Sequence, residues 1–134
     1  ANDFTPHNHV PNTVVYTGTH DNNTSVCWYA EQDEATRDYI RRYLRVPGDA
    51  IGWDLIRNGF ESPARLFVAP LQDFLSLGAD ARFNLPGTAG GNWAWRCNWE
   101  QLDSLRGGTA DYLRELNTLY ERPGIEPPEA EDEA

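Results

Sequence analysis

The stretch Val14–Thr24, with the sequence VVYTGTHDNNT, decides both the fold and the candidate site. It begins with β-branched and aromatic residues and continues after Gly18 into small, polar and ionisable ones. Residues 13–17 lack a regular alternation of apolar and polar side chains, which predicts a short strand covered on both faces, as in a parallel sheet. The predicted strand delivers His20 and Asp21 side by side to the loop that follows it.

Helices and one further strand are predicted after this loop. Asp33 is a good N-cap for a helix that ends before Pro47. A second helix is predicted from about Asp49 to Asn58-Gly59, where the glycine is typical of a helix end. The remaining predictions are a buried strand over 64–70, a short helical turn over 71–77, a loop over 78–99 and a helix over 109–121. This order predicts two βα units of a parallel α/β architecture.

Two parallel strands cannot by themselves make a sheet that is covered on both faces. Their outer edges would leave backbone groups without hydrogen-bond partners. The 134-residue sequence also contains no Met and opens on Ala1. We therefore expect the chain to be the end of a barrel or doubly wound sheet whose beginning is absent.

The composition limits the classes of function. Asp and Glu number 21 against 11 basic residues, all of them Arg, and the net charge of -10 argues against nucleic-acid binding. No apolar run is long enough for a membrane span and no signal peptide opens the chain, so we expect no membrane partner and a cytoplasmic location. Residues 122–134, rich in Pro and acidic residues, predict a disordered tail. Cys27 and Cys97 are expected to be reduced, buried thiols.

Candidate functional residues follow both predicted strands. Reactive groups in parallel α/β folds lie at the carboxyl ends of the strands, where the first loop carries His20, Asp21 and Asn22. The second loop carries Gln72, Asp73, Arg82, Asn84, Asn92, Trp93 and Trp95. A carboxylate, an imidazole, amides and aromatic rings without lysine suit a sugar, because they offer hydrogen bonds to hydroxyls and flat faces to the ring.

Other uses of these residues stay open from the pattern alone. His7 and His9, with His20 and Asp21, could form a zinc or iron site, although the two pairs lie far apart in the sequence. His20 and Asp21 could also merely cap the turn in which they lie. The glycine-rich segment 87–92 lacks the lysine and spacing of a phosphate-binding loop, and no Gly-X-Ser-X-Gly motif is present.

Four motifs in order carry a resemblance to a known family. They are VVYTGTHDNNT at 14–24, APLQD at 69–73, ARFNLPGT at 81–88 and GNWAWR at 91–96. Over residues 3–121 the chain resembles the C-terminal part of the amylomaltases, the 4-α-glucanotransferases of glycoside hydrolase family 77. The resemblance implies that residues 1–121 form the last two βα units of a (β/α)8 TIM barrel.

The resemblance also implies an activity without a cofactor or metal. The family transfers α-1,4-glucan segments between maltodextrin donors and acceptors by a retaining double displacement, which needs a nucleophilic carboxylate and an acid/base carboxyl group. Both groups are expected in the remaining N-terminal part of the barrel, so this chain alone is expected to be inactive. By the same resemblance Asp21 is the transition-state stabiliser, and His20 and Asn84 bind the sugar. Phe83 departs from the family, in which Met is more usual.

The other candidates are expected either to bind substrate or to support the loops. They are Asn22, Gln72, Asp73, Arg82 and Trp93. Asp73 and Arg82 are expected to form a structural ion pair, and Trp93 and Trp95 to pack against the end of the barrel. The main alternative function is a non-catalytic glucan-binding module. A weaker one is a metal hydrolase that uses His7, His9 and His20.

Overall fold

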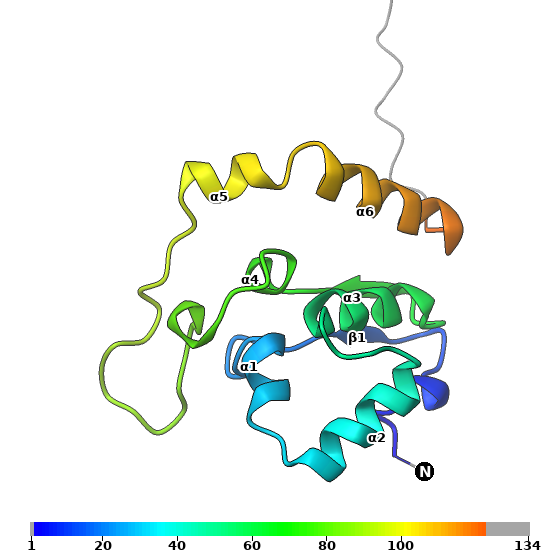
Figure 1. The fold of residues 1–134 in the computed structure, drawn as a ribbon, viewed down its shortest axis with the longest axis horizontal. Coiled ribbons are helices and arrows are strands. Elements are labelled where there is room, and N and C mark those ends of the chain that lie inside the picture. Colours follow the sequence, from blue (N-terminus) through cyan, green and yellow to red (C-terminus); the bar gives the residue numbers. More distant parts are fainter. Residues whose placement is uncertain (1, 123–134) are drawn as a thin grey trace, which may run out of the picture.

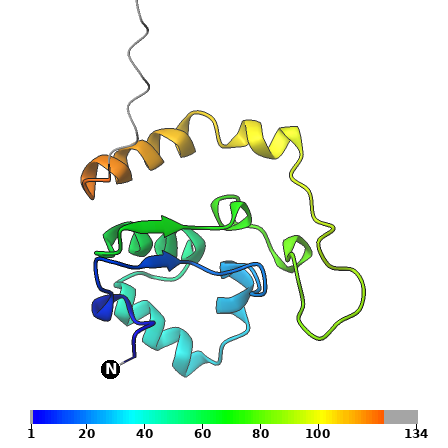
Figure 2. The ribbon, with the colours of Figure 1, turned by 180° about the vertical axis from the view of Figure 1, so that it is seen from behind.

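Two short parallel strands lie in the middle of the structure, a computed structural model that describes residues 2–122. β1 (Val14–Tyr16) and β2 (Leu66–Val68) pair residue for residue along their whole length. Figure 2 shows both strands pointing the same way, so the segments that follow them start at the same edge of the sheet. Both predicted strands are confirmed, and each is shorter than predicted.

Helical segments make up most of the rest of the described chain. In chain order they are η1 (Pro6–Asn8), α1 (Ser25–Ala30), α2 (Glu34–Leu44), α3 (Ile51–Glu61), α4 (Leu71–Phe74), η2 (Ala79–Ala81), α5 (Trp99–Ser104) and α6 (Gly108–Leu119). The cap of α2 is confirmed, because the Asp33 carboxylate accepts the N–H of Thr36 at 2.7 Å. Two further helices, α1 and α5, were not predicted, although Thr24 and Asn98 are suitable N-cap residues and cap these helices through their side chains.

The core lies between α3, the sheet and α6. Its buried centre consists of Ile56 and Phe60 of α3 and Leu116 of α6, with Phe67 of β2 packed against it. Figure 1 shows α5 and α6 on one side of α3 and α2 on the other, while the long segment between η2 and α5 extends away from the core. The predicted α/β class is therefore confirmed, with helices packed on one face of a small parallel sheet.

The predicted end of α3 at Asn58-Gly59 is wrong, because the helix continues to Glu61. A Cβ atom placed on Gly59 would lie 2.3 Å from Cε2 of Phe67, far inside van der Waals contact. Gly59 is therefore an interior helix residue that lets the ring of a strand residue pack directly on the helix backbone. This close approach fixes α3 against β2.

The prediction that the strands are covered on both faces is wrong for the described residues. Phe67 lies on the face that packs against α3, whereas the other face is exposed at Val14 (41%), Tyr16 (52%), Leu66 (53%) and Val68 (38%). Parallel register brings these four apolar side chains together. One side of the sheet is thus apolar and exposed to solvent in this chain.

Three smaller expectations can be compared with the structure. Cys27 and Cys97 are free thiols as expected, but each is half-buried and not fully buried. No helix within residues 2–122 combines the length and the apolar character that a membrane span requires. The predicted disordered tail lies, apart from Arg122, outside the described residues.

Candidate functional site

The loop after β1 forms a tight turn that presents His20 and Asp21. Asn22 closes this turn, because its Oδ1 accepts the N–H of Thr19 at 2.8 Å and the Thr19 hydroxyl at 3.0 Å. The side chains of His20 and Asp21 are 56% and 49% exposed. Asn22 therefore shapes the turn, and the imidazole and carboxylate at its tip are available to a ligand.

Asp21 meets a side chain from the loop after β2. Its Oδ1 accepts a hydrogen bond from Nδ2 of Asn84 at 2.7 Å, although the two residues are 63 positions apart. Nε2 of His20 lies 3.4 Å from the same oxygen. A carboxylate, an imidazole and an amide thus converge at the carboxyl ends of the strands. Because the sequence predicts that they bind sugar, we call His20, Asp21 and Asn84 the sugar cluster.

Arg82 holds the two loops together through main-chain carbonyls. Its Nη2 donates to the carbonyl oxygen of Asp21 at 2.8 Å, and its Nε donates to that of Asn84 at 2.9 Å. The predicted ion pair between Asp73 and Arg82 is wrong, because Asp73 accepts from Thr17 and Ser25 instead. Arg82 therefore fixes the backbone of the two residues of the sugar cluster that lie on different loops, Asp21 and Asn84.

The two neighbouring residues of α4 are buried. Asp73 is 2% exposed, and its carboxylate accepts three hydrogen bonds from Thr17 and Ser25. Gln72 is 4% exposed and donates from Nε2 to the carbonyl oxygen of Ala81 at 3.0 Å. Because neither side chain is accessible, both have a supporting role in this structure.

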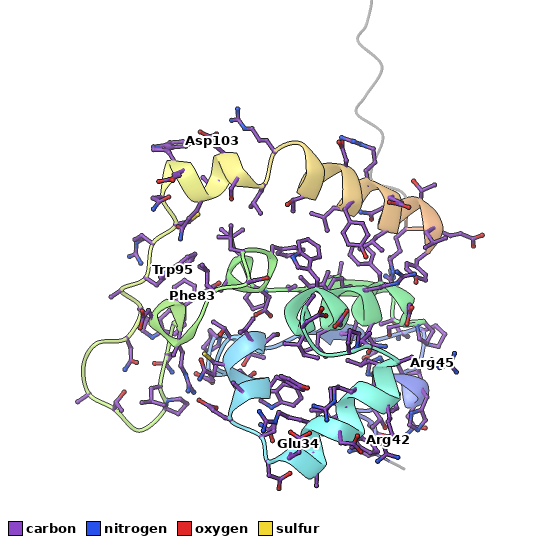
Figure 3. The ribbon with its side chains drawn as sticks, viewed as in Figure 1. Glu34, Arg42, Arg45, Phe83, Trp95 and Asp103 are labelled. Carbon is purple, nitrogen blue, oxygen red and sulfur yellow. The ribbon has the colours of Figure 1, made fainter. Side chains whose placement is uncertain are left out.

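Aromatic side chains lie next to the sugar cluster. The ring of Trp93 lies 5.0 Å from the ring of His20 between centroids, and Phe83 packs against Trp93. Phe83 also packs against Trp95, and Figure 3 shows these two residues close together. Trp95 is half-buried, while Trp93 is 53% exposed. A cavity of about 360 Å³ beside these rings is lined in part by His20, Arg82, Phe83 and Trp95. Trp93 is thus partly packed against neighbouring rings and partly accessible, and its packing against the end of a barrel stays a prediction.

The backbone at Trp93 is unusual. Its φ of 61° lies in the left-handed region, which non-glycine residues rarely adopt. The N–H of Trp93 donates to the carbonyl oxygen of Phe83 at 2.7 Å and stabilises this conformation. Asn92 acts nearby as a loop support, because its Oδ1 accepts the N–H of Leu85 at 2.8 Å.

The three histidines of the metal hypothesis lie apart. Nδ1 of His7 is 2.7 Å from the Tyr43 hydroxyl, and Nδ1 of His9 is 2.8 Å from the Ser62 hydroxyl, both towards the amino ends of the strands. His20 lies at the carboxyl ends. In the part of the chain that the structure describes, no group of three or more His, Cys, Asp or Glu side chains could hold a metal ion.

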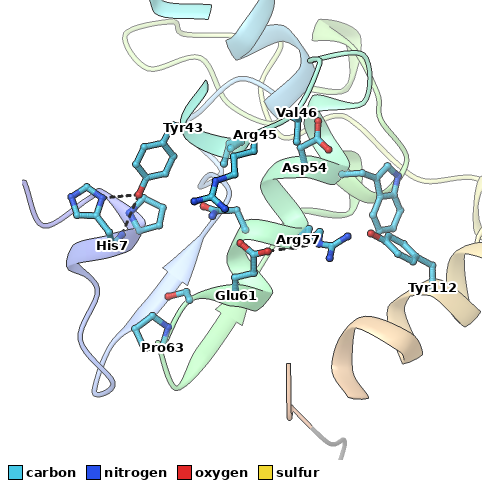
Figure 4. A pocket seen from close by; sticks show the side chains of 14 residues that line it. His7, Tyr43, Arg45, Val46, Asp54, Arg57, Glu61, Pro63 and Tyr112 are labelled. Atoms are coloured by element: carbon cyan, nitrogen blue, oxygen red, sulfur yellow. Dashed lines mark hydrogen bonds and ion pairs between the residues drawn. The ribbon is translucent and has the colours of Figure 1, made fainter. Parts of the chain in front are cut away.

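A second cavity lies away from the sugar cluster, at the amino ends of the strands. It has a volume of about 800 Å³ and is lined by residues of η1, α2, α3, α6 and the segments after α2 and α3, among them Tyr43, Arg45 and Tyr112 (Figure 4). Burial raises the pKa of the Asp54 carboxyl group on its wall, and the charge of Asp49 adds to this effect. None of the predicted sugar-binding residues lines this cavity.

The fold and the position of the polar residues define the chain as part of a parallel α/β protein with a polar cluster at the carboxyl ends of its strands. Comparison with known proteins identifies the family. The family model described as 4-alpha-glucanotransferase matches residues 1–102. The chain therefore belongs to the 4-α-glucanotransferases of glycoside hydrolase family 77.

Similar proteins agree with this assignment. The chain is 47% identical over 118 residues to a 4-alpha-glucanotransferase of Synechocystis sp., a match that covers 87% of the chain and 23% of the relative. It is 42% identical over 123 residues to the chloroplastic/amyloplastic 4-alpha-glucanotransferase DPE1 of Arabidopsis thaliana, covering 90% of the chain and 21% of the relative. A solved structure, the amylomaltase from Streptococcus agalactiae in complex with acarbose, matches with a TM-score of 0.84 and 32% identity, over 92% of this chain and 24% of that one. The chain thus spans less than a quarter of the length of these proteins.

Proposed function

We propose that this chain supplies the last two βα units of a (β/α)8 barrel that transfers α-1,4-glucan segments between maltodextrins. The observation that carries the proposal is the sugar cluster, in which Asn84 and His20 flank one carboxylate oxygen of Asp21 at 2.7 and 3.4 Å. Two loops that are distant in sequence meet there at the carboxyl ends of parallel strands, where α/β barrels carry their active sites. Membership of the family and the likeness to an acarbose-bound amylomaltase support a glucan as the substrate.

Asp21 is proposed to stabilise the transition state. As a glycosidic bond breaks, the sugar ring gains positive charge and its hydroxyls become stronger hydrogen-bond donors. An ionised carboxylate that accepts these hydroxyls then binds the transition state more tightly than the ground state. The hydrogen bond from Asn84 orients the Asp21 carboxylate, and half of the Asp21 side chain stays accessible to the sugar.

His20 and Trp93 are proposed to bind sugar beside Asp21. The imidazole of His20 can donate to a hydroxyl or accept from one, and its contact with the Trp93 ring restricts its orientation. The half-exposed indole of Trp93 offers a flat face of the kind on which a pyranose ring packs. These residues bind the substrate, whereas Asn22, Gln72, Asp73 and Arg82 keep the loops in place.

The nucleophile and the acid/base group are proposed to come from strands outside this chain. Retaining transfer needs two carboxyl groups about 5–5.5 Å apart. Asp73 cannot be one of them, because it is 2% exposed and its carboxylate already accepts three hydrogen bonds. The exposed apolar face of β1 and β2 further supports a closed barrel, in which more strands would pair with this sheet and cover that face.

The test has two parts. The 134-residue chain, incubated with maltotriose, is expected to release no glucose and form no longer maltodextrins. In the full-length barrel, Asp21→Asn is expected to lower turnover by about 10²–10³-fold, because an amide accepts the sugar hydroxyls less well than a carboxylate. Asp103→Asn is the matched control, since this exposed carboxylate of α5 pairs, within residues 2–122, with Arg106 alone. Disproportionation by the chain alone, or an Asp21→Asn enzyme as active as the control, would contradict the proposal.

A non-catalytic glucan-binding module is the second candidate function, favoured by the accessible ring of Trp93. Calorimetric titration of the chain with maltodextrins separates the two. Binding by the chain alone supports a module, whereas absence of binding supports a site completed by other strands. The cytoplasmic location stays a prediction, since the relatives include bacterial proteins and proteins named as chloroplastic/amyloplastic.

A further inference from the structure

We infer that Gln72 and Asp73, the buried polar pair of α4, are positioning residues that set the two loops of the sugar cluster against each other. The pair hydrogen-bonds to both loops from one short helix. The role of the two loops in sugar binding rests on the proposed function, whereas the hydrogen bonds that hold the loops do not depend on it. It assigns these residues no contact with substrate.

Asp73 fixes the loop that carries His20 and Asp21 at both of its ends. Before the turn, the hydroxyl of Thr17 donates to Oδ2 of Asp73 at 2.7 Å. After the turn, the hydroxyl of Ser25 donates to the same oxygen at 2.7 Å, and the N–H of Ser25 donates to Oδ1 at 2.8 Å. One carboxylate therefore determines where the turn begins and where it ends.

Gln72 fixes the start of the other loop. Its side-chain amide donates to the carbonyl oxygen of Ala81 at 3.0 Å, and Ala81 directly precedes Arg82. Arg82 then donates to the main-chain carbonyls of Asp21 and Asn84. Because consecutive helical side chains point in different directions, adjacent residues of α4 can reach the two loops separately.

A charged side chain at this buried position needs an explanation. Burying a carboxylate is costly unless hydrogen bonds replace its hydration, and a well-packed apolar residue would often stabilise a fold as well. All three donors to Asp73 belong to segments that flank the turn of His20 and Asp21. The hydrogen bonds thus give this loop a defined position, which apolar packing does not specify.

The position of this loop matters because the sugar cluster depends on short contacts across the two loops. The hydrogen bond between Asn84 and Asp21 measures 2.7 Å, so a small shift of either loop breaks it. Misplacing a reacting or binding group by about 1 Å can reduce turnover by about 10²-fold. Asp73 is 2% exposed and its carboxylate is fully engaged with Thr17 and Ser25, so it is expected to affect turnover through the position of Asp21.

The structural test uses solution NMR of the full-length enzyme. Wild type is expected to show the contact between the Asn84 side-chain amide and Asp21, and the core contact between Ile56 and Leu116. Asp73→Ala should lose the first contact and keep the second. Asp73→Asn should keep both, because its Oδ1 still accepts the Ser25 N–H and its amide group can donate to the rotated hydroxyls.

Two further variants keep the test decisive. Ser62→Ala is the matched control: it removes a buried hydroxyl that accepts the Ala64 N–H at the amino ends of the strands, and it should leave the Asn84–Asp21 contact unchanged. Thr17→Val removes only one of the three hydrogen bonds and should weaken that contact even if Asp73→Ala fails to fold. A wild-type full-length enzyme without the contact, or an unchanged contact in both Asp73→Ala and Thr17→Val, overturns the inference.

Kinetics of the full-length enzyme separate this inference from the proposed function. Asp73→Ala should lower kcat by about 10²-fold with a much smaller change in KM for maltotriose. Asp73→Asn should restore most of kcat. An inactive wild-type enzyme would refute the proposed function, while the loss of the NMR contact in Asp73→Ala would still support positioning. Equal kcat in wild type and Asp73→Ala would refute positioning alone.

Discussion

Replacing Gly59 with alanine tests the packing that places the sheet on α3. The added Cβ would lie 2.3 Å from Cε2, 2.5 Å from Cδ2 and 2.8 Å from Cζ of Phe67. Carbon atoms pack at about 3.5–4.0 Å, so the ring must move by about 1 Å or more. Phe60 restricts that movement, because its ring lies 5.2 Å from that of Phe67 between centroids.

The size of the effect follows from two opposing contributions. Overpacking a well-packed core costs about 1–3 kcal/mol. Alanine gains about 0.5–1 kcal/mol over glycine inside a helix, because it restricts the unfolded chain more. We therefore expect Gly59→Ala to lower the free energy of unfolding by about 1–2 kcal/mol.

The assay is urea denaturation followed by circular dichroism, with a control in the same helix. A Cβ on Gly52 would lie 3.5 Å from the carbonyl oxygen of Asp73 and 3.6 Å from Cγ2 of Val26, which is ordinary contact. Gly52→Ala should therefore be as stable as wild type or more stable. Adding Phe67→Leu to Gly59→Ala should recover part of the loss. Equal midpoints for Gly59→Ala and Gly52→Ala would refute the packing argument.

Two other predictions concern stability. Leu116→Ala removes a side chain that is 1% exposed between α3 and α6, and it should lower the free energy of unfolding by about 2–5 kcal/mol. Leu119→Ala, at a position that is 57% exposed, should change stability little. Equal denaturation midpoints for the two variants would contradict the described core. Burial raises the pKa of the Asp54 carboxyl group above its unfolded value, so its contribution to stability is complete below the unfolded pKa and is lost as the pH rises through the folded pKa. Asp54→Asn should therefore be more stable than wild type at pH 7, with a difference that shrinks as the pH falls through the folded pKa and is smallest below the unfolded pKa. Thermal melts across this range check it, and a difference independent of pH would contradict it.

Local signals in the sequence were sufficient for the elements that depend on local chemistry. The Asp33 cap and the spacing of apolar residues after it predict α2, and the structure shows both the helix and the capping hydrogen bond. The apolar runs around Val15 and Phe67 likewise predict the two strands. Such features are predictable because the groups that stabilise them lie within a few residues of each other.

Features that depend on contacts between distant segments were not predictable in this way. Gly59 is typical of a helix end, yet the ring of Phe67 requires a glycine inside the helix. The apolar residues of β1 and β2 indicate which surfaces favour burial, but the structure leaves Tyr16 and Leu66 about half exposed. The apolar residues of a strand indicate that its faces favour burial. They do not indicate which segment buries them or whether that segment belongs to the same chain.

In the candidate site, too, the positions of residues in the loops were predictable, whereas their long-range hydrogen-bond partners were not. Motifs place His20, Asp21 and Asn84 in two loops, and the parallel register of the strands brings those loops to one edge of the sheet. The sequence could not show that Arg82 binds main-chain carbonyls, since a guanidinium can pair with a carboxylate or a carbonyl according to geometry. For the same reason the partners of Asp73 became visible only in the structure.

The most direct test of the account compares kcat/KM for maltotriose disproportionation in three forms of the full-length enzyme. These are wild type, Asp21→Asn and the surface control Asp103→Asn, each measured by glucose release and by the appearance of longer maltodextrins. Asp21→Asn is expected to lose about 10²–10³-fold in activity, while Asp103→Asn should match wild type. An Asp21→Asn enzyme that matches the control would contradict the role of Asp21 and of the sugar cluster around it.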